Sequence, residues 1–394
     1  MKNNVFGATL LVAGTAIGAG MLALPVSMSA NGFIGALLIM VALWSVMLLS
    51  ALFMLEVALS LPVGTNLVSM ADATLGTAGR WIVWCLYLGL LYALNAAYLN
   101  GLMMMIQPWF VHLILPPALM SLLLLIAFMS VMWFGVRGLD HLNRLLVFGL
   151  VICYLLMMLK LLPMVNLQQL NHMHMQSSAW ATLPIVIVAY GFHIVIPSIR
   201  NYCGNDKISM IKSLVWGASI PLLVYLLWQI SIMGVIPSNG AYGLKQMLIS
   251  AQPAVDLPIS LVHFFPEKHL GELAKSFAGF AIATSFIGVS LSLSDFFADA
   301  LQWSKRGRQG FVILLLTFVP PLMCAMYYPK VFIGALAFGG LFVAILLAIL
   351  PTLMVAKLRL NPAYQPKWQV PGGVWSMLWV LLVGLAVLVS PVFA

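Results

Sequence analysis

Charged side chains are scarce in this chain, and their scarcity excludes a soluble globular fold. Only 7% of the 394 residues are charged, whereas a soluble domain carries about a quarter. Hydrophobic residues make up 63% of the sequence, and the mean hydropathy is +1.09. So few charges cannot cover a surface that faces water. The composition therefore predicts a polytopic membrane protein surrounded by a lipid bilayer.

Cysteine and metal-ligand patterns are equally sparse. The chain has four cysteines, and none forms a C-x-x-C pair that would indicate a metal site. His172 and His174 lie in a loop without further ligands, so a solvated loop is the better interpretation. We expect no metal and no cofactor. The net charge of +9 does not indicate a nucleic-acid partner, because cytoplasmic loops of membrane proteins collect Lys and Arg.

Long apolar runs make up most of the sequence. A helix needs roughly 20 apolar residues to cross a bilayer, whereas barrel strands are shorter and alternate in polarity. The runs do not alternate, so they predict an all-α bundle. We expect 11 transmembrane helices, over residues 5–29, 33–60, 81–111, 118–135, 142–162, 179–199, 213–236, 273–299, 310–328, 331–356 and 374–392.

The positive charges predict the orientation of these helices. With the N-terminus in the cytoplasm, 13 of the 18 Lys and Arg residues fall on the cytoplasmic side. Loops rich in Lys and Arg stay on that side. We therefore expect a cytoplasmic N-terminus and a C-terminus outside, in the periplasm. Residues 1–394 would form a single transmembrane domain.

The first apolar run contains residues that interrupt a helix. Residues 14–25 read GTAIGAGMLALP, with three glycines in seven residues and a proline soon after. Glycine and proline are the residues least compatible with a continuous helix. One interpretation is close helix packing through Gly14-x-x-x-Gly18. The other is a helix broken at the bilayer midplane, where free backbone groups line a protected cavity.

A second interruption favours the broken helix. The sixth run contains YGFHIVIP at 190–197, where a proline again follows a central glycine. Paired Gly/Pro interruptions in corresponding positions of two halves indicate a transporter site. The first five helices (about 5–163) and the next five (about 179–356) then form a 5+5 inverted repeat. Helices 1 and 6 are the broken ones, and residues 374–392 form one extra C-terminal helix.

The two interruptions offer backbone groups of opposite polarity. In the predicted orientation the second half of helix 1 begins at the break, so the N–H groups of Gly18, Ala19 and Gly20 suit a carboxylate. The first half of helix 6 ends at its break, so carbonyls near Ala189 and Tyr190 suit an ammonium. A carboxylate site beside an ammonium site describes the recognition of an α-amino acid.

These segments resemble a known family. VAGTAIGAGMLALP, YGFHIVIPSIRNY and ATSFIGVSLSLSDFFADAL are similar to signature segments of the bacterial hydroxy/aromatic amino acid permeases. LYALNAAYLNG and FVPPLMCAMYYPKVF extend the likeness across the chain, and it is strongest to the tyrosine-specific permeases. The resemblance implies proton-driven uptake across the bacterial inner membrane. It also implies the inverted-repeat fold of the amino acid–polyamine–organocation superfamily.

Several polar and aromatic residues are candidates for the site. His193 is the only histidine deep in an expected helix, where ionisable groups are costly and usually functional; its alternative is a neutral ring bonded to a carbonyl. Tyr92 and Asn95 share roughly one helix face, and interhelical hydrogen bonding is their alternative. The substrate-binding candidates are Thr15, Gly18, Ala19, Gly20, Met21, Tyr92, Asn95, Ala189, Tyr190, Gly191, Phe192, His193 and Ser285.

The proton route has three candidates: His193, Glu56 and Asp295. A buried carboxyl such as Glu56 can hold a proton through desolvation. The alternative for both carboxyls is simple neutralisation of nearby bases, such as Lys305 for Asp295. Sodium-driven members of the superfamily place hydroxyls where Ser285 lies, so sodium coupling stays open.

We therefore expect a secondary active transporter, not an enzyme. It would import an aromatic amino acid with protons by alternating access. Tyrosine is favoured, and a tryptophan or phenylalanine permease or a sodium-coupled symporter is the alternative. A membrane enzyme would need an acid/base constellation, which the isolated His193 does not provide. The preferred ring and the oligomeric state stay open.

Overall fold

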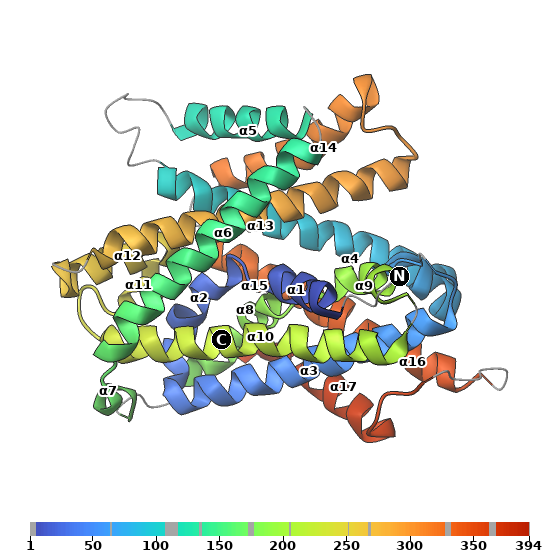
Figure 1. The fold of residues 1–394 in the computed structure, drawn as a ribbon, viewed down its shortest axis with the longest axis horizontal. Coiled ribbons are helices and arrows are strands. Elements are labelled where there is room, and N and C mark those ends of the chain that lie inside the picture. The colour runs from blue at the N-terminus through green and yellow to red at the C-terminus, as the bar shows by residue number, and fades with distance from the viewer. Residues whose placement is uncertain are drawn as a thin grey trace.

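The computed structural model describes residues 5–63, 65–106, 117–133, 136–171, 177–204, 206–250, 252–266, 269–327, 332–361 and 368–393. Within these ranges the chain forms helices and no strand. Figure 1 shows a bundle with α5 (Pro117–Trp133) along one edge and α17 (Gly373–Val389) along the opposite edge. The expectation of an all-α polytopic membrane protein is confirmed.

The first apolar run folds as two helices separated by a bend. α1 (Val5–Ala16) ends inside the glycine-rich segment, and α2 (Gly20–Ser27) starts after three intervening residues. The short turn η1 (Met28–Asn31) then leads into α3 (Gly32–Ser60). Gly32 adopts a φ of 67°, a conformation that side chains disfavour, so glycine makes this tight turn possible.

The remainder of the first half consists of long helices. α4 (Leu67–Ile106) bends at Gly76, where a φ of 77° again requires glycine. α5 follows it, and α6 (Val136–Leu161) crosses the bundle next. The turn η3 (Leu162–Met164) and the helix α7 (Leu167–Asn171) complete this half.

The second half begins with another interrupted helix. η4 (Ser177–Thr182) and α8 (Leu183–Ala189) precede the break, and η5 (His193–Val195) and α9 (Ile196–Cys203) follow it. The remaining elements are α10 (Lys207–Val235), α11 (Leu244–Ser250), α12 (Pro253–Phe264), α13 (Leu270–Leu301), α14 (Gly307–Tyr327), α15 (Phe332–Val343), the π-helical η7 (Ala344–Ile349), α16 (Leu350–Arg359), α17 and η8 (Ser390–Phe393).

The expected membrane spans and the observed helices agree in position. Each of the 11 expected runs overlaps a helix or a pair of helices. In the described ranges, nine stretches are long and apolar enough to cross a membrane. α1 has only 12 residues and α5 only 17, so the count of 11 stays a prediction. Residues 237–272, expected as a loop, contain α11 and α12, and α12 packs against α13.

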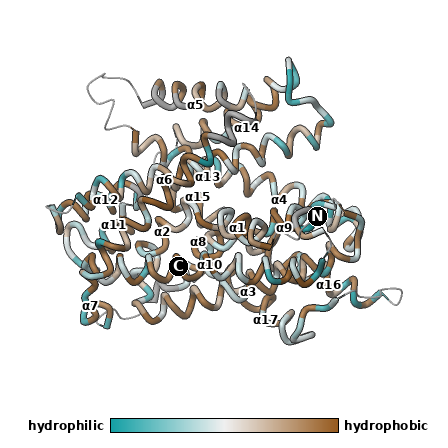
Figure 2. Tube along the Cα trace, viewed as in Figure 1, coloured by the Kyte–Doolittle hydropathy of each residue, from teal (hydrophilic) through white to brown (hydrophobic). Residues whose placement is uncertain are grey.

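Hydrophobic side chains cover the outside of this bundle. Figure 2 shows hydrophobic residues along the helix bodies and hydrophilic residues mainly at helix ends and loops. Trp375 of α17 is 81% exposed, and Phe6 of α1 is 73% exposed. Water penalises so large an exposed apolar surface, whereas lipid solvates it. The surface therefore fits a protein embedded in a bilayer.

Pro25 leaves a carbonyl inside α2 without its helical donor. A proline has no N–H, so the carbonyl four residues earlier loses its partner. That carbonyl belongs to Met21, and the indole Nε1 of Trp228 in α10 donates to it at 3.0 Å. A donor from a distant helix thus replaces the missing backbone group and ties α10 to α2.

A second proline creates the same need in α14. Pro320 has no N–H for the carbonyl of Leu316. The Tyr92 hydroxyl of α4 donates to that carbonyl at 2.8 Å. The helix break in α14 thereby becomes a cross-link between α4 and α14.

The third case lies where η7 meets α16. Pro351 follows Leu347 by four residues, and the Ser50 hydroxyl of α3 donates to the Leu347 carbonyl. π-helical segments are rare and often occur at functional sites. A Cβ placed on Gly191, in the break between α8 and η5, would lie 3.7 Å from Leu347 Cδ1. η7 therefore packs beside this break.

The bond between Trp228 and Met21 is testable by a double-mutant cycle. Trp228→Phe should lower the free energy of unfolding by about 1–3 kcal/mol, because it leaves a buried carbonyl without a donor. Pro25→Ala restores the missing N–H, so Trp228→Phe should cost less in that background. Thermal unfolding of the four purified proteins in detergent measures both costs. Equal costs in the two backgrounds would contradict the pairing.

Candidate functional site

The break between α1 and α2 exposes backbone N–H groups. The chain bends at Ile17 and Gly18, and no helical turn closes across these two residues. The N–H of Ala19 donates to the Ser285 hydroxyl of α13 at 2.9 Å. Among the described residues, none accepts the N–H of Gly18 or Gly20. Two free N–H groups therefore lie where α2 begins.

The break between α8 and η5 exposes a carbonyl. It covers residues 190–192. Tyr190 and Gly191 donate their N–H groups to carbonyls three residues earlier, at 3.2 and 3.1 Å. These bonds tighten the last turn of α8 and bypass the carbonyl of Ala189. Both expected helix breaks are thus present.

The two breaks meet beside α10. A Cβ on Gly20 would lie 3.4 Å from the Cα of Ala189, so the start of α2 touches the end of α8. The Tyr225 hydroxyl of α10 lies 2.7 Å from the carbonyl oxygen of Ala16 and 2.9 Å from that of Ala189. Tyr225 is fully buried, and its ring centroid lies 5.4 Å from that of Tyr190. One hydroxyl therefore contacts the free carbonyl ends of both half-helices.

His193 lies directly after the second break with unused polar atoms. Its side chain is fully buried, and neither ring nitrogen has a hydrogen-bond partner in the described chain. The buried Tyr190 hydroxyl is also without a partner there. Phe192 stacks on the His193 ring, with centroids 5.1 Å apart. Buried polar groups without partners are costly, so a ligand or a water molecule at this place would relieve that cost.

The two candidates in α4 have different surroundings. Asn95 is fully buried and accepts from the Ser290 hydroxyl of α13 at 3.2 Å, while its amide nitrogen has no partner among the described residues. Tyr92 instead donates to Leu316 of α14 and packs against Phe297. The hydrogen bond of Tyr92 matches the interhelical alternative given for this residue. Asn95 keeps a group for a ligand, and the Tyr92 hydroxyl is used by α14.

Thr15 and Met21 flank the first break. The Thr15 hydroxyl donates back to the Leu11 carbonyl at 2.7 Å, as hydroxyls inside helices commonly do. Met21 is fully buried, and its carbonyl receives the Trp228 indole. Neither side chain offers a polar group to the break, so both candidates shape it through packing.

Glu56 and Asp295, the two carboxyl candidates for the proton route, lie in ion pairs. Glu56 accepts from Arg359 Nε at 2.8 Å and Nη2 at 2.6 Å, and from the N–H of Val370 at 2.8 Å. Asp295 pairs with Lys305, and its side chain is 61% exposed. Such charge-assisted pairs fix helices to one another. The surroundings of both carboxylates match the neutralisation interpretation.

Gly14 packs against no described helix. It is exposed, and a Cβ at this position would meet no described atom within 4 Å. A Cβ on Gly18 would overlap the Ser285 hydroxyl. The close packing of α1 occurs elsewhere, where a Cβ on Gly217 of α10 would lie 2.5 Å from the Val12 Cβ. The Gly14-x-x-x-Gly18 packing interpretation is therefore wrong for Gly14.

Tyr225 and Trp228 are site residues that the sequence reasoning missed. They lie three residues apart in α10 and so share one helix face. The sequence did contain one signal for Trp228. Pro25 predicts that the Met21 carbonyl lacks its helical donor and needs another one. A Tyr and a Trp one turn apart in an apolar helix are suitable donors. The sequence does not say which helix supplies them.

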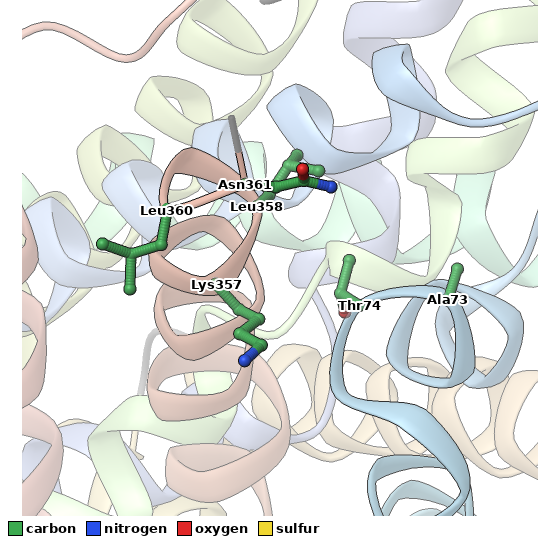
Figure 3. A pocket seen from close by; sticks show the side chains of 6 residues that line it. All are labelled: Ala73, Thr74, Lys357, Leu358, Leu360 and Asn361. Carbon is green, nitrogen blue, oxygen red and sulfur yellow. The ribbon is translucent and has the colours of Figure 1, made fainter. Parts of the chain in front are cut away.

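A surface pocket lies apart from the two breaks. Its lining residues come from α4 and from the end of α16, and Figure 3 shows them as Ala73, Thr74, Lys357, Leu358, Leu360 and Asn361. None of them belongs to either break. In the described chain no group of three His, Cys, Asp or Glu side chains is placed to hold a metal ion. His172 and His174 lie outside the described residues.

Comparison with known proteins extends these observations to a family. The model of the tryptophan/tyrosine permease family matches residues 1–391. The chain belongs to this family. The match covers both breaks and every helix that contacts them. It confirms the resemblance found in the sequence.

Named relatives of this permease align along almost its whole length. The tyrosine-specific transport system 2 of Haemophilus influenzae is 30% identical, over 99% of this chain and 97% of its own. The tryptophan-specific transport protein of Pseudomonas aeruginosa is 32% identical, over 100% and 95%. The low affinity tryptophan permease of Escherichia coli K12 is 28% identical, over 91% and 88%. All three are named as transport proteins or permeases, which supports a transporter and not an enzyme.

Gly18 and Gly14 form a matched pair for testing the break. Gly18→Ala should destabilise the permease by about 1–3 kcal/mol, because the methyl group overlaps the Ser285 hydroxyl. Gly14→Ala meets open space in a helix and should be neutral or slightly stabilising. Thermal unfolding in detergent compares them. Equal stability of the two variants would show that Gly18 does not approach α13.

Proposed function

We propose that this permease is a secondary active transporter that imports an aromatic amino acid together with protons. Family membership and the names of the relatives, which specify tyrosine or tryptophan, support the substrate class. The observation that carries the proposal is the contact between the two helix breaks. There, two N–H groups of one helix that have no described acceptor lie beside a carbonyl of each helix, and both carbonyls share the Tyr225 hydroxyl.

The first break is suited to the carboxylate of the substrate. The N–H groups of Gly18 and Gly20 are free at the start of α2, where the helix dipole is positive. The Ser285 hydroxyl accepts from Ala19 and keeps its own O–H for a further acceptor. Three donors can therefore converge on one carboxylate. The carbonyl ends of α1 and α8 supply the acceptors for the ammonium.

The side chain of the substrate would lie against the second break. Phe192 and Tyr190 offer aromatic rings there, and the His193 ring nitrogens and the Asn95 amide offer unused polar groups. A phenol or an indole N–H can pair with such groups, whereas the phenyl ring of phenylalanine leaves them unpaired. Buried polar groups left unpaired strongly disfavour the wrong substrate. Tyrosine is the favoured substrate, and tryptophan is the alternative.

Transport would proceed by alternating access around the two breaks. The two broken helices, α1 with α2 and α8 with α9, begin the two halves of the proposed 5+5 inverted repeat, residues 5–163 and 179–356. In such repeats one half moves against the other around a fixed midplane site. The distribution of Lys and Arg supports a cytoplasmic N-terminus and a periplasmic C-terminus in the bacterial inner membrane.

We assign the coupling proton to His193 in preference to Glu56 and Asp295. Glu56 has three donors from Arg359 and Val370, and Asp295 is exposed and paired with Lys305. The His193 ring has two unused nitrogens beside the substrate position. A ring that gains a proton donates from both nitrogens, so proton binding would change what the ring offers to the substrate.

Uptake into proteoliposomes tests the function. An inward proton gradient should raise accumulation of labelled tyrosine at least about threefold above equilibrium exchange, whereas a sodium gradient alone should not. Unlabelled tyrosine or tryptophan should compete at least about tenfold better than phenylalanine. Accumulation driven by sodium alone would overturn proton coupling. Absence of any competition by the three amino acids would overturn the substrate class.

The role of His193 is tested through the pH profile of uptake. His193→Gln keeps a polar side chain of similar reach but removes the titratable ring. It should flatten the dependence of uptake on external pH between about 5 and 8, because it removes the ring that we propose as the proton carrier. Asp295→Asn serves as the control and should keep the wild-type profile. A wild-type profile in His193→Gln would leave the proton to another group.

A further inference from the structure

In the described part of the chain, the carbonyls of Ala16 and Ala189 share a single donor. Both end a half-helix at a break, and no helical turn closes over either of them. The Tyr225 hydroxyl lies 2.7 Å from one and 2.9 Å from the other. A hydroxyl has one proton and two lone pairs. It can satisfy one carbonyl fully at any moment, so the second is left short of a donor.

This shortage distinguishes the breaks from the three proline sites. At those sites one carbonyl meets one side-chain donor, from Trp228, Tyr92 or Ser50. At the breaks, three oxygen atoms gather around one hydrogen, and Tyr225 is fully buried. An oxygen-rich and hydrogen-poor cluster in a low-dielectric interior favours a group that brings donors and positive charge.

A primary ammonium has the matching chemistry. It carries three N–H donors, one for each of the two carbonyls and one for the hydroxyl oxygen. The Tyr225 ring is held by the Tyr190 ring, and α10 is packed closely on α1 at Gly217, so the hydroxyl stays near both carbonyls. The hydroxyl proton can then turn to the remaining lone pair of a carbonyl. All three oxygens are satisfied only when the ammonium is present.

We propose that Tyr225 completes the ammonium site of this permease, with its hydroxyl oxygen as the third acceptor beside the carbonyls of Ala16 and Ala189. The inference rests on the proposed function and deepens it. It assigns to α10 a share in substrate recognition that neither break supplies alone. In the empty protein the same hydroxyl bridges the two carbonyls and keeps the site assembled.

Tyr225→Phe and Tyr154→Phe form a matched pair. The Tyr154 hydroxyl of α6 donates to the Val224 carbonyl at 2.9 Å, so its loss also removes one partly buried tyrosine–carbonyl bond at α10. Tyr154 contacts neither break through that bond. Thermal unfolding is measured for both variants, so that a general loss of stability is separated from a loss of recognition.

Binding is measured by displacement of labelled tyrosine from purified protein. The competitors are tyrosine, tyramine, which keeps the amine, and 3-(4-hydroxyphenyl)propanoate, which keeps the carboxylate and lacks the amine. Tyr225→Phe should weaken the binding of tyrosine and of tyramine by at least about tenfold, the size expected for a lost hydrogen bond to a charged group. The amine-free acid should change by less than about threefold, and Tyr154→Phe should leave all three ligands within about threefold.

The outcomes separate this assignment from the proposed function. If wild-type protein binds none of the ligands, the proposed function fails. If it binds tyrosine and Tyr225→Phe matches Tyr154→Phe, only the role of Tyr225 fails. Equal weakening of amine and acid ligands also overturns it, because that result marks general distortion. Sodium ions could also displace tyramine from the wild-type protein but not from Tyr225→Phe. That result would assign the three oxygen atoms to a metal cation instead of an ammonium.

A second substitution covers the case in which Tyr225→Phe does not fold. Incorporation of 3,5-difluorotyrosine at position 225 keeps the ring and hydroxyl, and in an assay at acidic pH, where the phenol stays protonated, it weakens the oxygen as an acceptor. This change should weaken the binding of tyramine more than the binding of the amine-free acid. Equal or tighter binding of tyramine would overturn the assignment.

Discussion

In the hydrocarbon core of a membrane, no water can hydrogen bond to a carbonyl that a helix leaves free. Each interruption of a helix in this permease therefore creates a need for a donor from elsewhere. Trp228, Tyr92 and Ser50 meet that need beside Pro25, Pro320 and Pro351. Because each donor lies on another helix, satisfying the backbone and assembling the bundle become the same event. The packing of α10 against α1 and α2 follows from this requirement.

The two glycine-rich breaks obey the same rule with a different result. Beside Pro25, Pro320 and Pro351, each free carbonyl has one side-chain donor of its own. At the breaks two carbonyls share the Tyr225 hydroxyl, while the N–H groups of Gly18 and Gly20 have no described acceptor. The protein therefore leaves both polarities incompletely paired at one place. An α-amino acid carries both complementary groups at fixed separation, which is why we propose it as the ligand of this arrangement.

Much of this architecture could be predicted from the sequence, because the decisive signals are local. Apolar length predicted the helices, and clustered Gly and Pro predicted both breaks, since these residues act on their own backbone. The functions of Tyr92 and Glu56 were harder, because partners on distant helices decide them. Tyr92 reaches Leu316 of α14, and Glu56 reaches Arg359 after α3 and α16 come together. Tyr225 was missed because a tyrosine in an apolar helix carries no local sign of its acceptors.

The indole that completes α2 also sets an order of assembly. Met21 and Trp228 are separated by 207 positions in the chain. When a chain is made from its N-terminus, the first helix enters the membrane long before its donor exists. During that interval the Met21 carbonyl must accept a hydrogen bond from another donor, either water at a loosened helix or the insertion machinery. α2 therefore reaches its final form only after α10 has been inserted.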